Sequence, residues 1–248
     1  MLAVTAAAED RHFWFRGLRR NARLMLDQAG VRGGLALIVD CGAGTGRNLD
    51  WLAGFGPVVG LDLTPLALEV GRRHHRRLVR GSVTELPFPS AAADLATSFD
   101  VLYCLDDEDE RRALREMWRI LRPGGVALFN TAALDVLRGS HSALTGELRR
   151  HTPARLRSSL TAAGFDVERV TFTNMCLFPP AFVVRGLQRL SGRAGTPSTS
   201  ELEVPATPVN RILDVCLKVE ARLLASTNLP IGTSVMAVAR KPRVQARS

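Results

Sequence analysis

The segment that most constrains this chain is an apolar stretch that ends in an acid and continues into a glycine-rich turn. Residues 37–49 read Leu-Ile-Val-Asp-Cys-Gly-Ala-Gly-Thr-Gly-Arg-Asn-Leu, which predicts a strand, a sharp turn and the start of a helix. Glycine lets a backbone turn sharply and approach a ligand closely. Turns of this kind hold nucleosides at the carboxyl edge of a parallel sheet. The segment therefore predicts an α/β fold with a nucleoside site.

The spacing of the glycines separates two kinds of nucleoside ligand. A dinucleotide site needs a third glycine three residues after Gly44, where this chain has Arg47. An acid, Asp40, also stands where a pyrophosphate would meet the start of the helix. That acid suits a ligand with an ammonium group and a sulfonium, which describes S-adenosylmethionine. The alternative is a strand–turn–helix junction whose glycines serve packing only.

A second acid follows the next apolar stretch. Residues 57–63 are apolar except for Asp62, which lies 22 positions after Asp40. An acid at this distance, at the tip of the next strand, can accept hydrogen bonds from both ribose hydroxyls of an adenosine. The alternative is that Asp62 caps the following helix. Because Thr64 already suits that position, we favour ribose binding.

Three further segments complete a resemblance to a known family. Residues 80–89, 93–103 and 114–125 resemble the adenine-contacting loop, the fourth strand, and the helix and turn before the fifth strand of class I S-adenosylmethionine-dependent methyltransferases. The resemblance is close over residues 35–132 and is to the small-molecule type. It implies S-adenosylmethionine as the cofactor and methyl transfer as the activity.

The resemblance, together with the two acids, places the cofactor contacts. Ser82 stands where the family commonly has an acid that accepts from the adenine amino group, and a hydroxyl accepts more weakly. The backbone amide of Val83 is still available to the ring edge. The expected contacts in this part of the chain are Asp40, Gly42, Ala43, Gly44, Gly46, Asp62, Leu63, Ser82, Val83 and Phe99.

Strand and helix patterns alternate as far as residue 173. They predict a doubly wound, mostly parallel, seven-stranded Rossmann-like sheet. A helix is expected to begin at Pro153 and to end at Gly164. A last strand over 234–240 is expected to run antiparallel, as the resemblance implies. The other strands are expected near 35–40, 57–62, 77–81, 94–100, 125–131 and 165–173.

We expect residues 1–248 to form one methyltransferase domain. Its expected parts are a helical cap (1–30), a cofactor-binding core (31–173), a helical insertion (174–230), the last strand (231–240) and a basic tail (241–248). The insertion stands where the family usually has a short turn. Three roles stay open for its helices: cover for the sheet or a partner subunit, a lid over a lipophilic substrate, or contact with a membrane surface.

The insertion itself divides into three stretches. Residues 177–190 predict an apolar helix, and residues 209–226 predict an amphipathic one. Between them, residues 191–208 are rich in Gly, Ser, Thr and Pro, which predicts a flexible linker.

Residues 11–20 are unusually aromatic for a chain in which Phe, Trp and Tyr make up 6% of the residues. In the family, an N-terminal helix folds over the cofactor. Trp14 is expected to shield the sulfonium, because a cation is attracted to an aromatic face. Arg16 or Arg20 is expected to bind the methionine carboxylate. The alternative is that these residues only pack the helix on the sheet.

The acceptor side is less clearly marked. His141 and His151 flank the stretch where the resemblance places acceptor-binding residues, and histidine is the usual base near neutral pH. Both are therefore candidate catalytic bases, with the alternative that they are surface histidines. Tyr103, Glu147 and Arg150 are candidate substrate contacts, and Glu147 is available to orient a histidine.

The formal net charge of +9 is the feature most open to misreading. The positive residues are mostly arginines dispersed along the chain, and the densest run, at 72–77, is expected at a solvated helix end. We therefore expect no nucleic-acid partner.

Four scattered cysteines predict neither a metal site nor a disulfide, and they favour a cytoplasmic location. No apolar run predicts a membrane span. Peripheral membrane contact stays open, as does the choice between monomer and homodimer.

The sequence thus predicts S-adenosylmethionine-dependent transfer of a methyl group to an O, N or C atom of a small or lipophilic molecule. Resemblance and composition point to secondary metabolism. One alternative is an RNA or protein methyltransferase, suggested by the charge. Another is a methyltransferase-like cyclase or regulator that uses the cofactor without transfer, an alternative that Ser82 keeps open.

Overall fold

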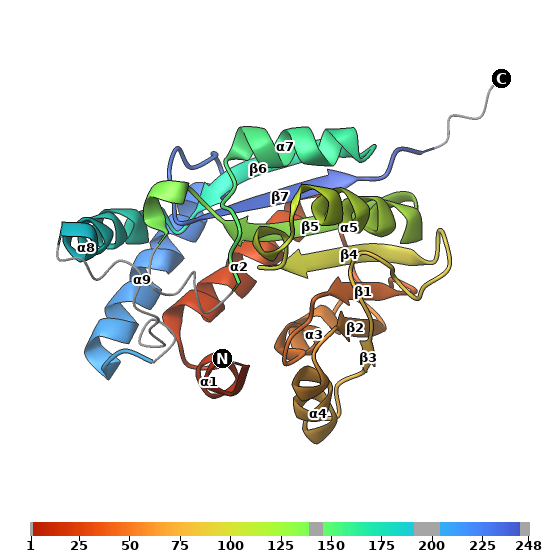
Figure 1. Ribbon diagram of the computed structural model, residues 1–248, viewed down its shortest axis with the longest axis horizontal. Helices are drawn as coiled ribbons and strands as arrows, with labels where there is room; N and C mark the ends of the chain where they lie inside the picture. Colours follow the sequence, from red (N-terminus) through yellow and green to blue (C-terminus); the bar gives the residue numbers. More distant parts are fainter. Residues whose placement is uncertain (1, 139–145, 191–203, 244–248) are drawn as a thin grey trace.

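The computed structural model describes residues 2–138, 146–190 and 204–243 (Figure 1). In these residues, seven strands form one sheet in the order β3-β2-β1-β4-β5-β7-β6. Strand β7 is antiparallel to both of its neighbours, and the other neighbouring pairs are parallel. The strands are β1 (Ile38–Cys41), β2 (Val58–Asp62), β3 (Leu78–Arg80), β4 (Ala93–Phe99), β5 (Leu121–Ala132), β6 (Asp166–Thr173) and β7 (Ser234–Arg240). The predicted seven-stranded Rossmann-like sheet is confirmed.

Helices cover both faces of the sheet (Figure 1). One core layer joins the sheet to α5 and α7, and the other joins it to α2 and α3. Strands β1 and β4 are therefore buried along their whole length, as expected for central strands of a parallel sheet with both faces covered. The helices are α1 (Leu2–Ala8), α2 (Phe13–Gln28), α3 (Arg47–Leu52), α4 (Pro65–Arg73), α5 (Asp107–Ile120), α7 (Pro153–Ala162), α8 (Phe178–Leu190) and α9 (Thr207–Leu224), with short 3-10 turns η1 (Leu102–Cys104), η2 (Asp135–Leu137) and η3 (Met175–Leu177).

Local signals explain where α7 begins and ends. The Thr152 side chain accepts a hydrogen bond from the Arg155 amide at 3.2 Å, and Pro153 takes the first helical position, where a missing N–H costs nothing. Gly164 follows the helix with a φ of +94°, which glycine adopts readily. The helix predicted between Pro153 and Gly164 is confirmed.

Two helices of the insertion lie on either side of residues 191–203, which fall outside the described residues. The linker predicted over residues 191–208 extends two residues too far at its C-terminal end, because α9 already begins at Thr207. Pro208 stands in its first turn, where proline is compatible with a helix. In the described ranges, no helix is both long and apolar enough to cross a membrane.

Helix α9 is held against α2 by close packing and by a shared carboxylate. Asp214 is 3% exposed and accepts from Arg16 at 2.9 Å and from Arg20 at 3.1 Å, while Lys218 adds a third cation at 2.9 Å. At the other end of α9, Glu220 accepts from the backbone amides of η3 and of the residue before it. The insertion is thereby attached to the N-terminal cap and to the end of β6.

We predict that Gly17→Val lowers the free energy of unfolding by about 1–3 kcal/mol, because a larger side chain must displace Leu217 from a packed interface. A Cβ atom at Gly17 would lie 2.6 Å from Leu217 Cδ1, whereas one at Gly186 would meet nothing within 4 Å. Gly186→Ala is the matched control and should keep or raise stability. Urea unfolding measures both, and equal stability of the two variants would contradict tight packing of α9 on α2.

Candidate active site

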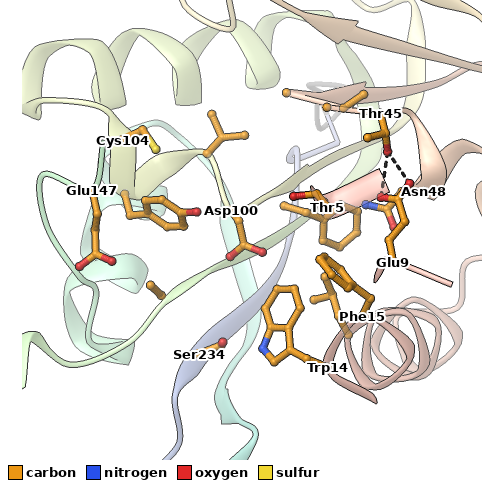
Figure 2. A pocket seen from close by; sticks show the side chains of 18 of the residues that line it. Thr5, Glu9, Trp14, Phe15, Thr45, Asn48, Asp100, Cys104, Glu147 and Ser234 are labelled. Atoms are coloured by element: carbon orange, nitrogen blue, oxygen red, sulfur yellow. Dashed lines mark hydrogen bonds between the residues drawn. The ribbon is translucent and has the colours of Figure 1, made fainter. Parts of the chain in front are cut away.

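A cavity of about 740 Å³ opens at the carboxyl edge of β1, β2 and β4. The turns that follow these strands form its floor, and α1, α2, η2, η3 and α8 contribute its walls. Figure 2 shows Glu9, Thr45 and Asn48 at one end, Glu147 and Cys104 at the other, and Asp100 between them. We refer to the end at the glycine-rich turn as the loop half and to the end at Glu147 as the far half.

The glycines of the turn after β1 have different tasks. Gly42, Gly44 and Gly46 have φ of +80°, +55° and +76°, a region that favours glycine. A Cβ at Gly42 would lie 2.2 Å from Val101 Cγ2, so this glycine is required for packing. A Cβ at Gly44 would meet nothing within 4 Å, so its face is open to the cavity. Gly42, Ala43 and Gly44 line the cavity, whereas Gly46 does not, because it serves as the N-cap of α3.

Asp40 and Asp62, the two acids picked out from the sequence, lie at different depths relative to the cavity. Asp40 is fully buried below the turn and accepts from the Thr97 hydroxyl at 2.6 Å, and desolvation by burial raises its pKa to about 7. It does not line the cavity, so the structure does not bring it to the predicted place of contact with the ligand. Asp62 does line it, accepting from the Gly44 amide at 2.8 Å and from the Thr64 amide at 2.9 Å.

Thr64 occupies the N-cap position of α4, as predicted, with Pro65 after it. Its side chain makes no cap hydrogen bond, and its hydroxyl instead donates to Asp62. Asp62 therefore supports the start of α4 and faces the cavity as well. The carboxylate has lone pairs for several donors, so these contacts leave room for ribose binding, which stays a prediction.

The remaining predicted contacts of the loop half meet around the cavity. Leu63, Ser82, Val83 and Phe99 all line it. The Ser82 hydroxyl lies 2.7 Å from that of Thr84 and accepts from the Thr84 amide at 3.2 Å. The serine that replaces the family's usual acid thus helps to shape its own turn.

The N-terminal cap reaches the cavity with residues other than those expected. Trp14 lines the cavity, where its ring packs edge-to-face on that of Phe15 with the ring centroids 4.9 Å apart. Neither Arg16 nor Arg20, the two residues expected to bind the methionine carboxylate, lines it, because both bind Asp214 of α9. Arg19 lines the cavity instead, and its guanidinium donates to the Glu9 carbonyl oxygen at 2.8 Å.

Glu9 is a functional candidate that the sequence reasoning missed. It lines the cavity at 6% exposure, and its two carboxylate oxygens lie 2.8 and 2.9 Å from the single Thr45 hydroxyl (Figure 2). Desolvation by burial raises the pKa of this carboxyl despite that hydrogen bond. No local pattern marks Glu9, because the contact joins residues 36 positions apart.

The far half contains all three predicted substrate contacts. Tyr103, Glu147 and Arg150 line the cavity. Glu147 is paired with the Arg150 guanidinium at 2.7 and 3.0 Å, and Arg138 lies 3.4 Å away. Desolvation by burial raises the pKa of the Tyr103 hydroxyl well above its ordinary value, so the phenol stays neutral.

Asp100 was also missed, although it is the first acid after β4. It lines the cavity with a φ of +60° and accepts from Asn130 Nδ2 at 2.9 Å. Desolvation raises its pKa to about 7. Its place directly after a buried strand, in line with the turn after β1, is the signal that could have identified it.

The histidine expectations fare differently. His141 lies outside the described residues. His151 is fully buried, with Nδ1 3.2 Å from the Thr131 hydroxyl and Nε2 3.2 Å from the Glu110 carboxylate. It does not line the cavity, and both ring nitrogens have protein partners. The structure thus does not bring His151 to the cavity, and its two contacts fix the segment that carries Glu147 and Arg150.

Sheet order, glycine-rich turn and cavity define a class: Rossmann-like α/β proteins with the loop geometry of a nucleoside site. Residues 39–129 match the family model described as a methyltransferase domain. The chain is 30% identical over 164 residues to a probable S-adenosylmethionine-dependent methyltransferase of Mycolicibacterium smegmatis, covering 64% of this chain and 62% of that protein. Over the matched residues 39–129, the chain therefore carries a methyltransferase domain similar to that of S-adenosylmethionine-dependent methyltransferases.

Two further similarities show how far the likeness to known proteins extends. The chain is 38% identical over 107 residues to malonyl-[acyl-carrier protein] O-methyltransferase of Serratia marcescens, covering 41% of this chain and 40% of that protein. It thus aligns with less than two thirds of the length of either relative. The crystal structure of the [4+2]-cyclase SpnF is similar with a TM-score of 0.58 and 20% identity, covering 93% of this chain and 83% of that one, which shows the fold alone.

We predict that Glu110→Gln lowers the free energy of unfolding by about 1.5–3 kcal/mol at neutral pH, because a charge-assisted hydrogen bond to His151 is weakened. Burial alone would raise the pKa of Glu110, but the hydrogen bond and charge of His151 bring it below its ordinary value. The stabilisation is therefore present above the ordinary carboxyl pKa and is lost as pH falls through the folded value.

Urea unfolding across pH measures this difference. Glu108→Gln, an exposed position on the same helix, is the control and should change little. A deficit that persists unchanged into acid would show that the Glu110 charge is not its source.

Proposed function

We propose that this protein transfers a methyl group from S-adenosylmethionine to a lipophilic small molecule that carries one protic group. The observation that carries the proposal is one continuous cavity with cofactor-type contacts in its loop half and a proton-accepting carboxyl, Asp100, at the border of its far half. A volume of about 740 Å³ lies in the upper part of the range for ligand sites, so it has room for two ligands.

The loop half fits the adenosine part of the cofactor. Gly44 leaves its face open, so that a ligand can approach the backbone. Asp62 faces the cavity as an acceptor for the ribose hydroxyls. Leu63, Val83 and Phe99 supply apolar contacts for the adenine, and Ser82 supplies a hydroxyl near its edge.

The methionine part of the cofactor has both an ammonium group and a carboxylate, and the cap offers a partner for each. The Glu9 carboxylate is buried with one hydroxyl donor, so an ammonium group would supply the missing hydrogen bonds and charge. Arg19 takes the role that Arg16 and Arg20 cannot, because its guanidinium lines the cavity beside Glu9. Trp14 offers a ring face to the sulfonium.

The bound cofactor supplies a methyl group on a positively charged sulfur, which is reactive toward a nucleophile in line with the C–S bond. The task of the chain is to position the acceptor and to take its proton. Asp100 lies between the two halves, and its raised pKa makes it a base near neutral pH. Asn130 orients the carboxylate through its hydrogen bond.

The walls of the far half indicate the class of acceptor. Leu137, Leu177 and Ala181 give it an apolar surface, while Glu147 and Arg150 largely neutralise each other. An apolar molecule with one hydroxyl, amine or acidic carbon fits this lining better than a polyanion. The division into cap, core and insertion, the cytoplasmic location and the link to secondary metabolism remain proposals from the sequence.

We predict that the wild-type chain binds S-adenosylmethionine and S-adenosylhomocysteine in calorimetry, and that Glu9→Gln weakens both by about ten- to hundred-fold through loss of a charged hydrogen bond. Binding of 5′-methylthioadenosine, which lacks the amino-acid end, should not change. Asp10→Asn is the matched control, since Asp10 pairs with Arg47 on the surface. Failure of the wild type to bind would refute the cofactor proposal, whereas equal weakening for all three ligands would refute only the role of Glu9.

We predict that Asp100→Asn lowers the rate of methyl transfer by about 10²- to 10⁴-fold, the usual contribution of a positioned base. Radiolabelled donor with a panel of phenols, long-chain alcohols and amines provides the assay. The wild-type rate should rise as pH increases through about 7, where Asp100 ionises, and this rise should be absent in the variant. Calorimetry should show unchanged cofactor binding, and a variant that keeps the wild-type pH profile would exclude Asp100 as the base.

A further inference from the structure

Helix α9 has one apolar face that no described residue covers. Its side chains at Val209, Ile212, Val215, Val219 and Leu223 are between 47% and 62% exposed. At about 100° per residue these five lie within an arc of about 120°, in a stripe about 21 Å long. We call these five residues the apolar stripe.

The opposite face of α9 is fully used. Leu217, Ala221 and Leu224 are buried, and Leu217 packs on Gly17 of α2. The helix is therefore attached to the domain by one apolar face and presents a second one outward. A surface helix normally has polar residues there, so the apolar stripe indicates a binding surface.

The exposed charge beside the apolar stripe is positive. Arg211, Lys218 and Arg222 are exposed and fall within an arc of about 40° that borders it. The acidic residues of α9, Asp214 and Glu220, are each 3% exposed and face the domain. The partner of the apolar stripe should therefore offer apolar contact together with negative charge.

We infer that the apolar stripe lies on the surface of a membrane that contains anionic lipids. An amphipathic helix that combines an apolar face with a basic border binds at the lipid interface by burying the first and pairing the second with headgroups. A second copy of this chain fits less well, because it would bring another basic border and no exposed acid on α9. This inference does not depend on methyl transfer.

Helix α8, the other helix of the insertion, also has exposed apolar side chains, and it borders the cavity. Phe182 and Leu187 are 48% and 61% exposed, whereas Ala181 and Arg185 of the same helix line the cavity. Both insertion helices also contact η3. A domain attached to lipid through the insertion would hold the far half of its cavity one helix away from the bilayer, which suits an acceptor that partitions into membranes.

Co-sedimentation of the full chain with phosphatidylcholine vesicles, prepared with and without phosphatidylglycerol, tests the inference. We expect binding to the anionic vesicles only, and weakening by salt. Ile212→Asp should reduce binding by about tenfold or more, because it places a charge in the buried stripe. Arg211→Gln/Arg222→Gln should reduce it by about thirty-fold, since each basic residue near an anionic surface contributes about fivefold.

Matched controls make the same kinds of charge change on α4, away from the apolar stripe. Leu66→Asp alters an exposed apolar position of α4, and Arg72→Gln/Arg73→Gln removes two basic residues at the end of that helix. Both should bind vesicles like the wild type, and thermal unfolding checks that every variant is folded. The inference is overturned by absence of wild-type binding, by equal losses in the controls, or by light scattering that shows a dimer dissolved by Ile212→Asp.

Discussion

The hydrogen bond from the Gly44 amide to the Asp62 carboxylate joins the two turns on which the cavity depends. One turn follows β1 and the other follows β2, and the parallel pairing of those strands brings their ends to the same edge. The second oxygen of Asp62 fixes the start of α4 through Thr64. A carboxylate that holds both turns while facing the cavity shapes the site before any ligand arrives, which lowers the ordering cost of binding.

What the sequence could predict follows from how local each signal is. The glycine-rich turn, the alternation of strands and helices, and the limits of α7 depend on neighbouring residues, and these predictions are confirmed. Glu9 and Arg16 depend on contacts 36 and 198 positions away, with Thr45 and Asp214, and no local pattern contains them. His151 was predicted as a base from its residue type and from its place beside the expected acceptor-binding stretch, but it is buried between Thr131 and Glu110, which no local pattern indicates.

The insertion explains why Arg16 and Arg20 do not line the cavity. Three cations, Arg16, Arg20 and Lys218, surround the single buried carboxylate of Asp214. A buried carboxylate without a partner would destabilise the fold, so Arg16 and Arg20 of α2 face α9 and not the cavity. Arg19 lies three residues after Arg16 and one before Arg20, so its side chain is turned by about 60° from the first and about 100° from the second, and it lines the cavity. The same helix pairing that fixes the cap also leaves the apolar stripe on the outer side of α9.

The acids around the cavity share a property that suits a cationic ligand. Desolvation raises the pKa of Glu9, and it raises the pKa of Asp40 and Asp100 to about 7. Because folding favours their protonated forms, the stability that they contribute is lost as pH rises from the ordinary carboxyl range toward 7. A positively charged ligand in the cavity favours the ionised forms and offsets that loss. A site with these acids is therefore less stable alone than with a cation bound, which is the direction expected of a protein built to hold a sulfonium.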